Sequence, residues 1–193
     1  MNERVLARDN CDCIMGFQGG CSEIIKAPTT MWDFQLFENE ETFLRGIIKD
    51  AWQCKNLVTN QGKNSLNEVY FRSGTQITAW YIALFSSNTT PEVAMTYATP
   101  IYTETILYAD NRKSFVPAGS VNQSITNVAD RAVFTMNDAV TIYGCALVGG
   151  GSAAATKNDK AGGGTLYCAS KFAVAKDVIA TNILYIGMTI SQT

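Results

Sequence analysis

Six cysteines are the residues of this chain best suited to chemistry, and three of them lie in the stretch NCDCIMGFQGGC near its start. No basic residue lies directly beside Cys11 or Cys13, and Cys21 follows a pair of glycines. The other three cysteines are spread along the chain at Cys54, Cys145 and Cys168. Cysteine can bind metal, act as a nucleophile or form a disulfide, and its neighbours distinguish these roles.

The spacing disfavours both metal binding and catalysis. A structural zinc site usually has two C-x2–4-C pairs, whereas this chain has one C-x-C pair and no histidine. A catalytic thiol needs a basic or cationic neighbour, which the first two cysteines lack. The absence of histidine also removes His-based triads and proton shuttles. We therefore assign no catalytic, metal-binding or cofactor-binding residue and expect a protein that is not an enzyme.

We predict that Cys11, Cys13 and Cys21 make contacts between subunits, including disulfides formed after release from a reducing cytosol. Thiols on an extended arm reach another subunit more easily than they staple their own core. The alternative is three unpaired thiols in a loop. Cys145 and Cys168 lie in the apolar stretches YGCALV and LYCAS, which favours buried small side chains over a pair of facing strand cysteines.

Composition indicates one globular domain with an appendage. The chain has 193 residues, of which 47% are hydrophobic and only 17% charged, with a net charge of −2. No cluster of Lys and Arg is longer than two residues, which argues against nucleic acid as a partner. The apolar runs are too short to span a bilayer, and MNERVLARDN lacks the apolar region of a signal peptide. We expect synthesis in a cytosol and no membrane partner.

The N-terminal cysteines lie in a segment that we expect to be an arm. Residues 1–30 show no sustained hydrophobic period, and three glycines and Pro28 interrupt any helix or strand. We predict an extended N-terminal arm with a short apolar anchor, CIMGF. The alternative is a disordered tail.

Residues 31–193 read as one β-domain. In MWDFQLF, alternation places Trp32, Phe34 and Leu36 on one face of a strand. ENEE predicts a polar turn, after which TFLRGIIKDAWQCKNLV predicts further strands and a hairpin.

One short helix is predicted near 60–71, with Thr59 or Asn60 as its cap. Leu66, Val69 and Tyr70 would share its apolar face, and Gly62 would weaken its first turn.

The β-branched and aromatic stretch TQITAWYIALFSS predicts a buried strand after the helix. Residues 87–113 predict long irregular loops, which are usually functional or docked on a neighbour. Further on, GGGSAAATKNDKAGGG predicts a flexible tip between strands.

The last third predicts several short strands, with Ala132, Phe134 and Met136 on one face of the first. The last strand has an apolar face of its own, made of Leu184, Ile186, Met188 and Ile190. This pattern indicates a mainly β fold, an antiparallel β-sandwich of Ig-like or jelly-roll-like type with one short helix.

The order of several motifs over residues 55–192 resembles a family of tailed-bacteriophage virion structural proteins. The matching stretches are KNLVTNQGKNSL, YFRSGTQITAWYIALF, TPIYTETILYADNRKSFVPAGSVNQSITN, ADRAVFTMNDAVTIYGCALVGG and GGGTLYCASKFAVAKDVIATNILYIGMTIS. They correspond to the family's NLVTN-G-N helix entry, WY-GL strand, Y-E loop ending in R-F-PG, A-FT strand, GAFL-like strand and GTLY strand. This chain departs from the family at Ala83, where glycine is usual, and at IATN, where the family has an acidic-glycine turn.

The resemblance implies a component of the virion, similar to capsid decoration or cement proteins. Its partners would be the major capsid protein or other virion proteins, in many copies or as a homo-oligomer on the particle. A neck, collar, tail or fibre module for host adhesion is the alternative. A polysaccharide-degrading enzyme is a further alternative, but it would need a paired-carboxylate cleft that the scattered acids do not suggest.

Overall fold

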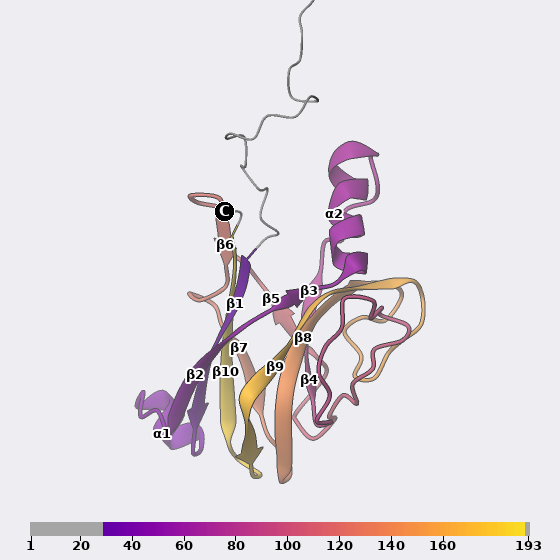
Figure 1. Ribbon diagram of the computed structural model, residues 1–193. Helices are drawn as coiled ribbons and strands as arrows, with labels where there is room; N and C mark the ends of the chain where they lie inside the picture. Colours follow the sequence, from indigo (N-terminus) through magenta and orange to yellow (C-terminus); the bar gives the residue numbers. More distant parts are fainter. Residues whose placement is uncertain (1–28, 192–193) are drawn as a thin grey trace, which may run out of the picture.

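The computed structural model describes residues 29–191 (Figure 1). The predicted arm therefore lies outside the described residues, apart from Thr29 and Thr30, which belong to the first strand. Cys11, Cys13 and Cys21 also lie outside them. Two antiparallel sheets of five strands each face one another, which confirms the mainly β sandwich.

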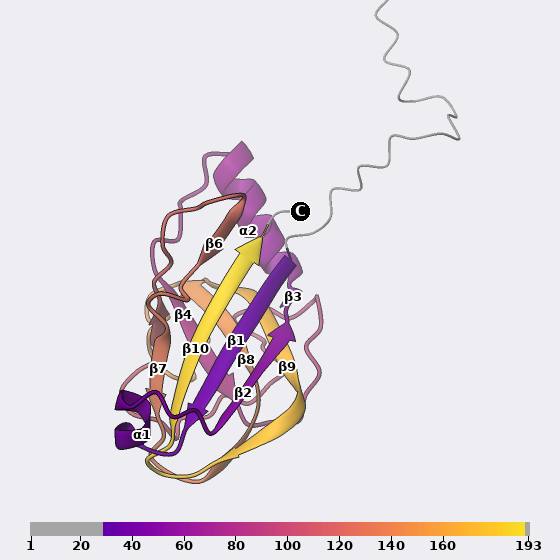
Figure 2. The same ribbon diagram turned by 90° about the vertical axis from the view of Figure 1, so that its left-hand side faces the viewer.

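The first sheet has β10 at its centre, flanked by β1 on one side and by β6 and β7 on the other (Figure 2). β1 pairs with β10 along its whole length and with β2 on its far side, which confirms the predicted hairpin. The strands are β1 (Thr29–Phe37), β2 (Asp50–Lys55), β6 (Ser124–Thr126), β7 (Ala132–Thr135) and β10 (Ile183–Ser191).

The second sheet has the order β3-β9-β8-β4-β5 and is built around a long hairpin of β8 and β9. β4 lies between β8 and the short strand β5. The strands are β3 (Leu57–Val58), β4 (Trp80–Phe85), β5 (Lys113–Phe115), β8 (Val140–Gly150) and β9 (Gly164–Val178).

The core between the sheets follows the predicted alternation. The predicted faces of β1, β7 and β10 point inward, and all their members are buried except Ile190, which is half-buried. The buried members are Trp32, Phe34, Leu36, Ala132, Phe134, Met136, Leu184, Ile186 and Met188. Such burial of alternate side chains is the main stabilising term of a sandwich, at about 25 cal/mol per Å² of apolar surface.

A second apolar cluster lies on the outer face of the second sheet. There Ala83 and Phe85 of β4 and Ala146 and Val148 of β8 are buried under residues from the irregular stretch after β4. Both faces of these strands are therefore covered, which explains why YIALF and CALV are continuous apolar runs instead of alternating ones.

The described residues contain two helices beside the sheets, one more than predicted. α1 (Glu40–Leu44) replaces the expected polar turn, because Asn39 and Thr42 form a reciprocal capping box at its start. No helix among residues 29–191 is long and apolar enough to cross a bilayer.

α2 (Asn60–Phe71) is the predicted helix, with Thr59 as its cap. It extends past the ends of the sheets (Figure 1). Leu66 packs against the core as expected, but Tyr70 is 79% exposed, so its predicted place on a buried face is wrong. The reason is the helix's direction: its last turn has no sheet beneath it.

Candidate interaction site

The first turn of α2 is fixed tightly against β9. The Thr59 hydroxyl donates to the Leu166 carbonyl and accepts from the Gly62 amide. A Cβ on Gly62 would lie 2.4 Å from the Tyr167 carbonyl oxygen, so only glycine allows this approach. The sequence predicted that Gly62 would weaken the first turn of the helix, whereas the structure requires glycine there for packing.

Gln61 ties the same turn to two further segments. Its side-chain oxygen accepts from the amides of Tyr97 and Leu166, and its NH₂ group donates to the Gly164 carbonyl. The base of α2 is thus held by side-chain hydrogen bonds, and the helix forms a fixed wall beside the second sheet.

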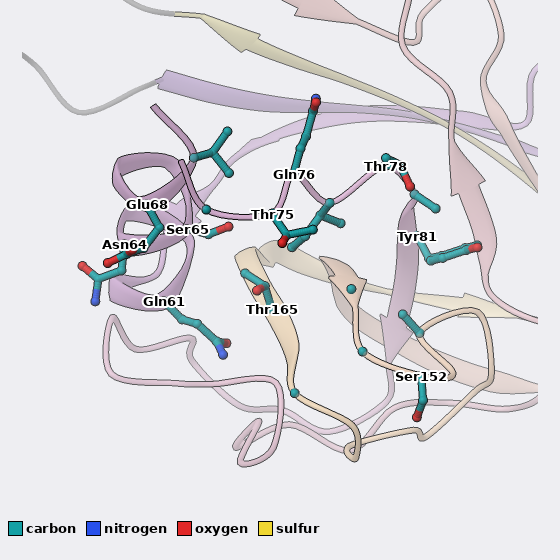
Figure 3. Close-up of a pocket in the computed structure, with 18 of the residues that line it drawn as sticks. Gln61, Asn64, Ser65, Glu68, Thr75, Gln76, Thr78, Tyr81, Ser152 and Thr165 are labelled. Carbon is teal, nitrogen blue, oxygen red and sulfur yellow. The ribbon is translucent and has the colours of Figure 1, made fainter. Parts of the chain in front are cut away.

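Beside that wall lies an open groove of about 700 Å³ (Figure 3). α2 borders one side with Asn64, Ser65 and Glu68; residues 74–79 run along it, and residues 150–155 lie on the other side, with Thr165 between. Most lining residues are small or polar. Glu68 is the one charged side chain among them, and it pairs with Arg72.

The segment Thr75–Thr78 lines the groove without any hydrogen-bond partner for its backbone among residues 29–191. The sequence predicted a strand from Thr75 onward, but β4 begins only at Trp80. This part of the prediction is wrong because the neighbouring strands end here. Trp80, the first residue of β4, pairs with Gly149 in β8 and with Phe115 in β5.

Exposed aromatic side chains mark the far end of α2. Tyr70 is 79% and Phe71 is 83% exposed, which are unusual values for large apolar rings. Tyrosine is enriched among the residues that dominate binding energies at protein interfaces. The groove and this aromatic end belong to one helix, and we treat them together as a candidate surface for binding protein.

A contrasting polar cluster is buried on the outer side of the second sheet. Arg112 and Glu104 form a two-pronged ion pair, with Nε to Oε1 at 2.8 Å and Nη2 to Oε2 at 2.6 Å. Both side chains are only 3% exposed. Burial alone would lower the pKa of Arg112, but the hydrogen bonds and charge of Glu104 outweigh it and raise that pKa.

The same cluster holds the turn that the sequence predicted to be a flexible tip. Arg112 donates to the carbonyls of Ala154 and Asp159, and the Asn158 amide donates to Glu104. Residues 151–163 are therefore folded back against the irregular stretch 86–112. The prediction failed because glycine-rich composition reports local freedom and says nothing of a distant charged partner.

Tyr97 joins this cluster through its hydroxyl, which donates to the Asp159 carboxylate at 2.6 Å. Burial and this hydrogen bond raise the pKa of Tyr97 to about 12. The Arg112 guanidinium also lies over its ring, 5.8 Å from the centroid. The polar groups of this cluster thus hydrogen-bond one another, and the cluster offers no free group to a ligand.

The three described cysteines are free thiols. Cys145 and Cys168 are fully buried, which confirms their interpretation as small core side chains. They do not face one another, since Cys145 pairs with Ser170 and Cys168 with Leu147. Burial raises the pKa of both well above the usual thiol range, and raises that of Cys54 to about 11.

No family model matches the chain, and a search of curated proteins finds no match either. The candidate site thus stands on its geometry alone. Among residues 29–191, no three His, Cys, Asp or Glu side chains gather closely enough to hold a metal ion. What the groove offers is unpaired backbone, small side chains and neighbouring aromatic rings, a set suited to binding another polypeptide.

Proposed function

We propose that this chain is a structural virion protein of a tailed bacteriophage, a capsid decoration or cement protein that binds neighbouring capsid subunits. The proposal takes the class of particle from the motif order over residues 55–192. It takes the mode of action, binding without chemical conversion, from the candidate interaction surface.

The motifs of the resemblance coincide with contacts that shape the fold. Glu104 is the acid of the Y-E loop, and Arg112 is the first residue of the R-F-PG segment. Their buried ion pair fixes the irregular stretch and the 151–163 turn together. The spacing of these motifs therefore has a structural reason, which supports reading them as one pattern.

The observation that carries the binding role is the surface around α2. Two exposed rings, Tyr70 and Phe71, end a helix that also walls an open groove. This end of α2 and the start of β1 lie toward the same end of the molecule (Figures 1 and 2). A cement protein acts through several modest contacts, whose combined avidity exceeds each one alone.

Particle composition tests the proposal. We expect purified particles of the encoding phage to contain the chain in many copies spread over the shell, located by a density map and counted by quantitative mass spectrometry. A small ring of copies at the neck or tail would favour the adhesion module. Particles that lack the chain would overturn both roles.

A binding measurement tests the surface. Full-length chain should bind undecorated shells from the same phage, and a Tyr70→Ser, Phe71→Ser double variant should bind at least tenfold more weakly. Lys63→Ala, also on α2 but outside the groove and away from the aromatic end, is the matched control. Equal binding by all three proteins would contradict the assignment of this surface.

A further inference from the structure

We propose that residues 75–78 accept an added β-strand, and that the strand is the N-terminal CIMGF segment, residues 13–17, of a neighbouring copy of this chain. The inference deepens the proposed function, on which it rests for the choice of a neighbouring copy. Its other grounds are the backbone, the groove and the charge of the described residues.

The first ground is a stretch of backbone that is ready to pair. Residues 74–79 run without a turn or bend, and Thr75–Thr78 lack backbone partners within residues 29–191. Backbone amides and carbonyls are obligatory hydrogen-bonding groups, and an extended, unpaired row of them is a template for another strand. Adding a peptide to such a row is a common mode of protein recognition.

The second ground is the conflict between sequence and structure at this point. Thr75, Ile77 and Thr78 are β-branched and favour strands, as the sequence predicted. The backbone of residues 74–79 contains no turn or bend, yet Thr75–Thr78 have no backbone partner among residues 29–191. β8 turns away at Gly150 and Gly151, whose φ angles are +68° and +69°, so the sheet supplies no neighbour. A residue pattern that encodes a strand without a partner indicates a partner from outside.

The third ground is the shape of the site. Residues 75–78 lie along a hollow between α2 and residues 150–155 (Figure 3). A hollow bordered on both sides in this way is suited to one inserted chain. Its volume of about 700 Å³ lies within the range of about 300–1,000 Å³ typical of ligand pockets.

The fourth ground is charge and side-chain size. Glu68, the one charged lining residue, already pairs with Arg72, so the groove favours a neutral strand. Gly151 and Ala153 are among the small residues that line the groove, so no bulky side chain from this turn fills it. CIMGF carries no charge and is flanked by Asp12 on one side only.

The occupant must also be able to reach a second copy. Residues 18–28 separate CIMGF from the start of β1. At about 3.3 Å per residue these eleven positions span up to about 36 Å when extended. Each copy would donate one strand and accept another, a head-to-tail contact that closes into a ring if the rotation permits.

Disulfide trapping tests the contact directly, since Cys13 lies in the donated strand. Full-length chain carrying Gln76→Cys, with Cys11→Ser and Cys21→Ser, should form intermolecular crosslinks under mild oxidation. Mass spectrometry should identify a Cys13 linkage to the introduced thiol. The same background with Asn111→Cys, an exposed position outside the groove, is the matched control and should crosslink at least tenfold less.

Mixing full-length chains of two sizes separates the outcomes. Crosslinks between the two sizes support donation to a neighbour. Crosslinks only within one chain, or equal crosslinking at residues 76 and 111, overturn the inference. The core thiols interfere little, because Cys145 and Cys168 are buried and burial raises their pKa.

Proline variants give a second reading that needs no thiol. Thr75→Pro and Gln76→Pro each remove one amide, and successive amides point to opposite edges of a strand. At least one should weaken self-association tenfold or more relative to Thr75→Ala and Gln76→Ala, with unchanged circular dichroism. Unweakened association in two folded proline variants overturns the inference. If these variants fail to self-associate but still bind undecorated shells, strand donation is supported independently of shell binding. If the unmodified chain binds no shell, the proposed function fails, whatever the proline variants do.

Discussion

The buried cluster around Arg112 and the groove beside α2 both border the 151–163 turn, but their polar groups are used in opposite ways. In the cluster, Arg112 and Glu104 find their partners within the chain. Along the groove, the backbone of Thr75–Thr78 finds none among the described residues. The difference separates a region that maintains the fold from one that can bind.

Physical cost explains why the two regions differ. A buried charge is tolerated only when it is paired and fully hydrogen-bonded, because desolvation costs several kcal/mol per ion. Unpaired backbone in an open groove is hydrated, so it costs little until a partner displaces the water. Variants in the first region should therefore change stability, and variants in the second should change association.

The largest expected effect is at Arg112. Arg112→Ala leaves Glu104 buried without its cation and frees the carbonyls of Ala154 and Asp159. We expect a loss of about 3–5 kcal/mol in the free energy of unfolding, measured by urea denaturation. Arg131→Ala is the control, since its partner Asp33 is partly exposed, and it should cost clearly less. Equal losses would contradict the special role of the buried cluster.

A smaller effect is expected at Gly62, where the groove wall meets the sheet. Gly62→Ala gains about 1 kcal/mol of helix propensity but places a methyl group against the Tyr167 carbonyl. Overpacking of this kind costs about 1–3 kcal/mol, so we expect net destabilisation and a shifted α2. Asn64→Ala, two residues along the helix and exposed, should instead be neutral or stabilising. Thermal unfolding of the two variants provides the comparison.

How much of this arrangement was predictable depends on the range of the interactions. The alternation of Trp32, Phe34 and Leu36 and the Thr59 cap are local signals, and the structure confirms them. The docking of the 151–163 turn depends on Arg112 reaching Ala154, 42 positions away, which no local period reports. Composition alone therefore described a folded turn as a flexible one.

The candidate site shows the same limit in another form. The strand propensity of Thr75–Thr78 was visible in the sequence, but its lack of a partner was not, because that depends on where β8 turns. The exposure of Tyr70 also depends on how far α2 extends past the sheets. The sequence predicted which elements form. It did not predict where they end, because that depends on packing, and the candidate site lies at those ends.

Alkaline pH should probe the cluster more gently than Arg112→Ala. The folded-state pKa of Tyr97 is raised to about 12, against about 10 for an unfolded tyrosine. The neutral phenol thus contributes stability that is fully present below about pH 10 and is lost as pH rises toward about 12. Tyr97→Phe removes the hydrogen bond to Asp159, so we expect a loss of about 1 kcal/mol at pH 7.

The same variant should also flatten the pH dependence of unfolding between about pH 10 and 12, measured by denaturant titration at each pH. Tyr143→Phe is the control, because Tyr143 lies in β8 and its hydroxyl makes no hydrogen bond to Arg112, Glu104 or Asp159. A Tyr97→Phe protein with an unchanged alkaline slope would show that the phenol is not coupled to the fold.

The smallest effect on stability is expected at the aromatic end of α2, where the comparison is sharpest. Tyr70→Ser and Phe71→Ser remove rings that are 79% and 83% exposed, so the free energy of unfolding should change by no more than about 0.5 kcal/mol each. A change in shell binding with unchanged stability would place these rings in an interface. A loss of more than about 1 kcal/mol in either variant would instead mean that the rings pack within the fold, and the division between the two regions would fail at this end of α2.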